Sequence, residues 1–188
     1  IYYTPGSLRA TNCQQGRTMM EIFCREQEIP IDICGKVIVA VDKKEQERLQ
    51  AIYERGQAND VKCRLLDRHE LRDIEPHTAG IAAIHVPETG IVNFKTVCER
   101  LAELVCDRGG AIVTGAKVLD IKHNTTSVQV ETSSGDFSGG YFINCTGIYC
   151  DRIAKKTGHR SPAKNVPFRG EYYELKPSAH HLCNHLIY

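Results

Sequence analysis

Residues 141–153 read YFINCTGIYCDRI, and this stretch decides the fold class that the sequence indicates. The apolar residues 141–145 predict a short strand, which runs into a small-residue turn at Thr146 and Gly147. A helix is predicted to follow from about residue 149. A strand that leads through a glycine turn to a helix start is typical of folds that bind nucleotides, because free N–H groups point outward there. The stretch therefore predicts an α/β fold with a nucleotide site at this turn.

The glycine pattern GxGxxG, which should accompany such a site, is absent from the 188 residues. One alternative is that Gly147 only lets the backbone turn after a buried strand. The long helix, the strand and the small meander predicted before residue 141 favour the nucleotide site over this alternative, because the combination is more specific than a single glycine.

The composition excludes several classes of protein. Lys and Arg number 24 against 23 Asp and Glu, and this balance gives no reason to expect nucleic acid as a partner. No apolar run approaches the roughly 20 residues that a membrane-spanning helix needs. The nine cysteines form no CxxC pair and are odd in number, which argues against a disulfide framework and favours a reducing, intracellular setting.

The hydrophobic pattern predicts alternating helices and strands. Helices are expected at 7–27, 42–59, 67–76, 93–108 and 149–156, and strands at 35–41, 61–66, 81–86, 111–113, 117–123, 128–132, 141–145 and 166–176. We interpret residues 1–86 as an α+β lobe, 87–160 as part of a doubly wound α/β lobe, and 161–188 as a return into the first lobe. The first residues contain no initiator Met and the last resemble an interrupted strand, so we expect a portion of a longer protein.

Two polar segments are candidates for chemistry. In VPFRGEYYE, residues 166–174, Arg169 stands beside a glycine, and a guanidinium fork suits a carboxylate. The alternative is a strand-surface arginine paired with Glu171 or Glu174. The histidine-rich residues 180–185 match no familiar metal spacing and are expected in a solvated loop. The sequence therefore predicts no metal site, and it identifies no catalytic base.

The segments together resemble the FAD-dependent oxidoreductases of the D-amino-acid oxidase type, most closely the branch that acts on L-2-hydroxyglutarate. The resemblance implies an α/β fold with an α+β substrate lobe, in two lobes, whose N-terminal dinucleotide fingerprint is lacking from these residues. It covers nearly the whole chain in the expected order. It is carried by IYYTPGSL (1–8), CGKVIVA (34–40), PETGIVN (87–93), CTGIYCDR (145–152) and VPFRGEYY (166–173).

The resemblance also implies sites by position. Val118 lies in the strand whose backbone meets the adenine end of FAD, and the turn of Thr146 and Gly147 passes close to the FAD diphosphate and ribose. For the substrate, Tyr2 and Tyr3 follow the segment beside the flavin ring. Arg169, with Tyr172 or Tyr173, resembles the strand that leads into the substrate lobe. The substrate-side residues expected from the resemblance are therefore Tyr2, Tyr3, Arg169 and Tyr172.

The implied activity is oxidation of L-2-hydroxyglutarate, or a similar 2-hydroxy acid, to the 2-oxo acid by hydride transfer to flavin. The alternatives are an amino-acid or glycerol-3-phosphate oxidoreductase and, in another class, a non-catalytic α/β binding module. Residues 1–188 alone are expected to be inactive. The electron acceptor, oxygen or quinone, stays open. The expected location is cytoplasmic or peripheral to the inner membrane, and mitochondrial in a eukaryote.

Overall fold

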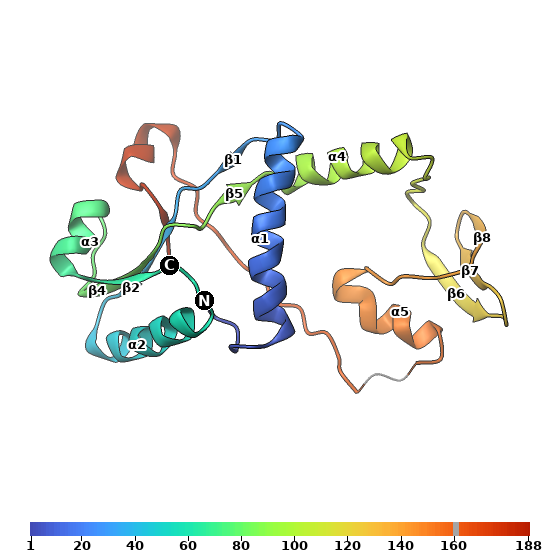
Figure 1. Ribbon diagram of the computed structural model, residues 1–188, viewed down its shortest axis with the longest axis horizontal. Coiled ribbons are helices and arrows are strands. Elements are labelled where there is room, and N and C mark those ends of the chain that lie inside the picture. The colour runs from blue at the N-terminus through green and yellow to red at the C-terminus, as the bar shows by residue number, and fades with distance from the viewer. Residues whose placement is uncertain (160–161) are drawn as a thin grey trace. The chain divides into compact units, whose positions relative to one another are not determined.

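The computed structural model describes residues 1–159 and 162–188, which form two compact units (Figure 1). The first unit comprises residues 1–104 and 174–188, and the second comprises residues 105–173. Both units combine helices with β-sheet, so the predicted mixed α/β fold class is confirmed. The assignment of residues 1–86 and 161–188 to a substrate lobe and of 87–160 to a flavin lobe stays a prediction.

A four-stranded sheet forms the centre of the first unit. Its spatial order is β3 (Arg64–Asp67), β4 (Ala82–Val86), β2 (Lys36–Ala40) and β9 (Leu186–Ile187). The first three strands pair antiparallel, whereas β9 runs parallel to β2. The end of the chain thereby lies beside residues that precede it by about 150 positions in sequence.

Two helices cover the opposite faces of this sheet (Figure 1). Helix α2 (Lys43–Ala58) packs through Leu49, Ile52 and Tyr53 on one face, and α3 (Arg68–Ile74) packs through Leu71 on the other. Alternate residues of a strand point to opposite faces, so the apolar run of β2 is buried on both sides. The face under α2 contains Ile38, Ala40, Ala82, Ile84 and Val86, and the face under α3 contains Val37, Leu66 and Ala83.

A third apolar cluster joins the long helices α1 (Leu8–Glu26) and α4 (Phe94–Asp107). Its buried members are Cys24, Ile29 and Val97. The two-stranded ribbon of β1 (Ile31–Asp32) and β5 (Ile91–Val92) contributes Ile31 and Val92 to the same cluster. This cluster fixes the C-terminal half of α1 within the first unit.

The second unit contains a three-stranded antiparallel meander and a short helix. The strands are β6 (Val118–His123), β7 (Val128–Thr132) and β8 (Gly135–Gly139), and the helical residues are η1 (Gly147–Tyr149) and α5 (Cys150–Lys156). The strand β8 covers residues for which the sequence predicted no strand. In the first unit, a 3-10 helix, η2 (Pro177–Leu182), leads into β9.

Three predicted strands are wrong. The described residues 111–113, 141–145 and 166–176 adopt no strand. Tyr141 and Ile143 are 95% and 82% exposed, so the apolar residues that predicted a buried strand face solvent. A strand is stable only when a neighbouring strand takes up its N–H and C=O groups, and no such neighbour pairs with these segments among the described residues.

The start of α3 gives a prediction about pH. The Oδ1 atom of Asp67 accepts hydrogen bonds from the backbone N–H groups of His69 and Glu70 at 2.8 and 2.9 Å, and the Glu70 carboxylate accepts one from the Asp67 N–H. The bond from Glu70 is the main cause that lowers the pKa of Asp67. A lowered pKa stabilises the fold above the unfolded pKa of about 3.9, and this stabilisation is lost as the pH falls through the folded pKa.

We therefore expect Asp67→Ala to lower the urea midpoint at pH 7, and the difference from the wild type to shrink below about pH 4. Asp67→Asn is the matched control, because an Asn side chain still caps the helix but carries no titrating carboxylate. Urea unfolding followed by circular dichroism at several pH values measures both variants. An Asp67→Ala difference that stays constant with pH contradicts the prediction.

Candidate functional site

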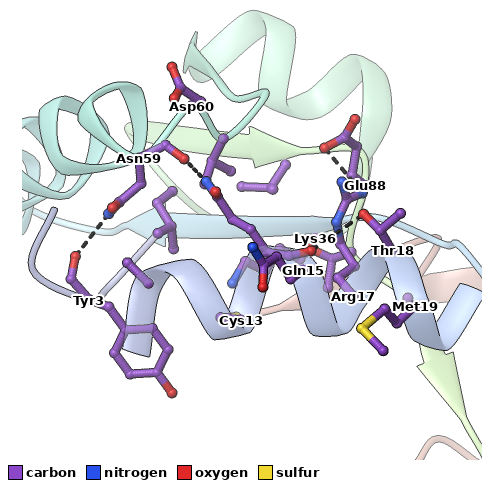
Figure 2. A pocket seen from close by; sticks show the side chains of 17 residues that line it. Tyr3, Cys13, Gln15, Arg17, Thr18, Met19, Lys36, Asn59, Asp60 and Glu88 are labelled. Atoms are coloured by element: carbon purple, nitrogen blue, oxygen red, sulfur yellow. Dashed lines mark hydrogen bonds and ion pairs between the residues drawn. The ribbon is translucent and has the colours of Figure 1, made fainter. Parts of the chain in front are cut away.

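A cavity of about 790 Å³ lies within the first unit (Figure 2). It is lined by the N-terminal segment, the first half of α1, the start of β2, the end of α2 and the turn at residues 86–90. This volume is within the usual range of small-molecule sites, about 300–1,000 Å³. All of its lining residues belong to the same compact unit.

Hydrogen bonds to the end of α2 position the N-terminal segment beside the cavity. The side chain of Asn59 donates to the carbonyl of Tyr3 at 2.9 Å, and the side chain of Gln14 donates to the carbonyl of Asn59 (Figure 2). The Arg55 guanidinium donates to the carbonyl of Tyr2 at 3.1 Å. These bonds tie three separate stretches of sequence into one wall of the cavity.

An ion-pair network occupies another wall. Glu88 lies 3.2 Å from Arg17 and 2.7 Å from Lys62, and Arg17 also approaches Glu21 at 3.4 Å. The hydrogen bond from Lys62 is the main cause that lowers the pKa of Glu88. The positive charge of Arg17 is therefore already compensated by two carboxylates.

Lys36 lines the same cavity but has a different environment. Its Nζ atom lies 4.9 Å from the ring centroid of Tyr2 and 5.3 Å from that of Tyr188. Burial lowers the pKa of Lys36, and burial also raises the pKa of the Tyr2 phenol. Two aromatic faces thus surround a partly buried ammonium at the cavity.

The structure places some of the sequence-predicted substrate residues together. Tyr3 lines the cavity, and Tyr2 contacts Lys36, which also lines it. Arg169 and Tyr172 lie in the second unit and are 86% (side chain) and 79% exposed. Arg169 pairs with Glu171 at 3.1 Å, which is the alternative that the sequence left open. Substrate contacts of all four residues stay predictions.

The predicted cofactor residues lie in the second unit. Val118 begins β6, and its pairing with β7 is interrupted by an irregularity before Asp120. Thr146 bonds through its hydroxyl to Asn144 at 2.7 Å. Gly147 opens η1 with φ of +54°, and among the described residues no heavy atom beyond its chain neighbours lies within 4 Å of the position that a Cβ would occupy. The turn thus combines a conformation that favours glycine with open space beside the backbone.

The sequence interpretation missed Lys36 and misplaced His185. Lys36 carried a signal, because it is a charged residue at the start of an apolar strand that is buried on both faces. His185 is not in a solvated loop: its Nδ1 atom lies 2.7 Å from Oε1 of the fully buried Glu75. No local pattern links two residues 110 positions apart. Among residues 1–159 and 162–188, no group of three metal-ligating side chains suits a metal ion.

Comparison with known proteins identifies the family. Residues 1–188, the whole chain, match the family described as FAD dependent oxidoreductase. The chain belongs to this family. The resemblance that the sequence indicated is therefore confirmed, together with the FAD dependence that the family's name states.

Relatives of this FAD-dependent oxidoreductase chain carry one recurring name. It is 43% identical over 190 residues to L-2-hydroxyglutarate dehydrogenase of Indibacter alkaliphilus, covering 100% of this chain and 48% of the relative. It is 40% identical over 203 residues to the mitochondrial L-2-hydroxyglutarate dehydrogenase of Nematostella vectensis, covering 100% and 44%. The chain thus spans less than half the length of these relatives.

A solved structure shows the same fold. The FAD-bound L-alpha-glycerophosphate oxidase of Mycoplasma pneumoniae superposes with a TM-score of 0.75 at 21% sequence identity, covering 83% of this chain and 43% of that one. At this identity the likeness concerns the fold alone. In the described part of the chain, no helix has both the length and the apolar character needed to cross a membrane.

Proposed function

We propose that the protein containing this chain oxidises L-2-hydroxyglutarate, or a close 2-hydroxy acid, to the corresponding 2-oxo acid. The observation that carries the proposal is the match over the entire chain, at 43% and 40% identity, to relatives from a bacterium and an animal that bear the same name. The cavity beside Tyr2 and Tyr3 supports it, because the cavity combines the volume of a small-molecule site with a positively charged side chain.

The residues of the second unit fit a role in holding FAD. The open space beside Gly147 lets a ligand approach the backbone closely, and the Thr146 hydroxyl, which donates to Asn144, keeps oxygen lone pairs that accept a hydrogen bond. We propose that Gly147 and Thr146 contact FAD through these groups, and that Val118 contacts it through the backbone of its strand. When bound, FAD supplies the acceptor for the hydride that leaves C2 of the substrate. The chain's own contribution is to orient the acid and to hold its carboxylates.

The electron acceptor and the location are also proposals. Reduced flavin is reoxidised by oxygen or by a quinone, and a quinone would require contact with a membrane surface. We propose a mitochondrial location if the source is a eukaryote, as the name of the Nematostella relative indicates, and otherwise a cytoplasmic location or one peripheral to the inner membrane.

The test uses a full-length protein that carries these 188 residues. We expect it to purify yellow, because it binds oxidised flavin, which absorbs at about 450 nm. This absorbance should be lost when L-2-hydroxyglutarate is added without oxygen. Bleaching by an amino acid or by glycerol 3-phosphate instead would assign the protein to another branch of the family. A colourless protein that cannot be reconstituted with FAD would leave only the non-catalytic binding module.

A further inference from the structure

The position of Lys36 follows from the register of the central sheet. Lys36 is the first residue of β2 and lies opposite Val86 of β4. Because alternate residues share a face, its side chain lies on the same face as Ile38 and Ala40, and these two residues belong to the apolar cluster under α2. The ammonium therefore stands at the border of the apolar cluster, where that cluster meets the cavity.

In the described part of the chain, this ammonium has two aromatic neighbours and the thiol of Cys13 near it, but no carboxylate partner. Among residues 1–159 and 162–188, no carboxylate lies within 4.0 Å of it. The cavity contains two carboxylates, of which Glu88 is already paired with Arg17 and Lys62, while Asp60 is exposed. The rings of Tyr2 and Tyr188 hold the ammonium but do not neutralise its charge.

A partly buried cation without a counter-ion is costly unless a ligand provides one. One alternative is that Lys36 only clamps Tyr2 and Tyr188 to the sheet. A clamp of that kind has no need to line a cavity, whereas Lys36 lines one with the volume of a small-molecule site. Burial also weakens hydration of the ammonium, as its lowered pKa indicates, and this strengthens its attraction for an anion that enters the cavity.

We propose that Lys36, held between Tyr2 and Tyr188, binds a carboxylate of the substrate in this cavity. This inference rests on the proposed function for the identity of the substrate, an acid with two carboxylates. It assigns to Lys36 a binding role: the ammonium donates charge-assisted hydrogen bonds to a carboxylate oxygen, and it takes no part in proton or hydride transfer.

The first test measures anaerobic flavin reduction by L-2-hydroxyglutarate in the full-length protein that carries these residues. We expect Lys36→Met to raise the Kd for the substrate by about 10- to 100-fold, as for loss of a charge-assisted hydrogen bond, with the limiting reduction rate nearly unchanged. Lys36→Arg retains the charge and should recover most of the affinity. Lys95→Met is the matched control, because Lys95 is an exposed lysine of α4 that pairs with Glu99 at 3.7 Å.

Comparison with L-2-hydroxypentanoate, which has a methyl group in place of the distal carboxylate, identifies the carboxylate that binds. If Lys36→Met weakens the binding of L-2-hydroxyglutarate alone, the distal carboxylate binds Lys36. If it weakens the binding of both acids equally, the carboxylate that they share binds Lys36. Either result supports the inference. A Kd for L-2-hydroxyglutarate that changes less than twofold in Lys36→Met overturns it, even while the wild-type flavin bleaches normally.

A second measurement needs no variant and no flavin reduction. Glutarate is titrated into the isotopically labelled full-length protein that carries these residues, and NMR follows the ε-CH₂ resonances of Lys36 and Lys95. Saturable shifts at Lys36 alone support the carboxylate site, including the case in which L-2-hydroxyglutarate fails to bleach the full-length protein and the proposed function falls. Absence of shifts at Lys36 at millimolar glutarate, together with an unchanged Kd in Lys36→Met, refutes the site while leaving the proposed function intact.

Discussion

Replacement of Glu75 by Ala is expected to destabilise the first unit by roughly 3 kcal/mol, because the change removes one partner of a buried, hydrogen-bonded pair. The Glu75 side chain is fully buried at the C-terminal end of α3. Its Oε1 atom accepts hydrogen bonds from the Asn184 N–H at 2.9 Å and from His185 Nδ1 at 2.7 Å. Without the carboxylate, both donors lose their partner in a partly buried position.

The loss of stability in Glu75→Ala should be concentrated at the end of the chain. Residues 184 and 185 lead directly into β9, whose pairing with β2 continues in the bond from the Tyr188 N–H to the Val37 carbonyl at 3.0 Å. If Glu75 holds this segment in place, its removal frees β9 before the rest of the sheet unfolds. The same change would release Tyr188 from the ammonium of Lys36.

Urea unfolding measures the overall loss, and amide hydrogen exchange at Leu186 and Tyr188 measures the local one. Asp73→Ala is the matched control, since Asp73 is a carboxylate of the same helix whose side chain is 64% exposed and lies 3.3 Å from His69. Glu75→Gln should lower the free energy of unfolding by less than Glu75→Ala does, because the amide oxygen still accepts one hydrogen bond. Equal protection of Leu186 in wild type and Glu75→Ala would show that the buried carboxylate does not hold β9.

How much of the fold follows from the sequence is clear from the two units. In the first unit, caps and apolar periodicity predicted α2, α3, β2 and β4 to within a few residues, because each element buries its apolar face against a neighbour in the same unit. In the second unit, residues 141–145 have the same apolar character, yet they form no strand. The apolar character of a segment predicts that it would be stable as a buried strand, but a strand forms only where a neighbouring strand pairs with it.

The candidate site was less predictable than the fold for the same reason. The resemblance indicated Tyr2 and Tyr3, since they lie in a segment with its own sequence pattern. The charge of Lys36 at the start of an apolar strand was a local signal, but its second aromatic neighbour, Tyr188, is 152 residues away and reaches it through the parallel pairing of β9 with β2. Similarly, Glu75 and His185 meet only after α3 and the chain end have packed together. Contacts of this range arise from topology and leave no local signal.

The second large effect is expected from Ile84→Ala, which should destabilise the first unit by about 2–5 kcal/mol, the usual range for an Ile-to-Ala change in a core. Ile84 is fully buried at the middle of β4, opposite Ile38, and packs in the cluster under α2. The backbone of a paired strand cannot collapse into the space left behind, so the loss of transfer free energy is joined by the cost of a cavity.

Leu65→Ala is the matched control, because Leu65 lies directly opposite Ile84 in β3 but is 39% exposed. Truncation there should cost about 1 kcal/mol or less, since the leucine leaves water only in part. Urea midpoints with unchanged m-values measure both losses of stability. Equal losses in the two variants would mean that the cluster under α2 is not the main core.

Ile84→Ala should also leave the glutarate shifts of Lys36 intact below its unfolding transition, whereas Lys36→Met should leave the urea midpoint nearly unchanged. Stability and carboxylate binding would then belong to different residues on the same face of one sheet.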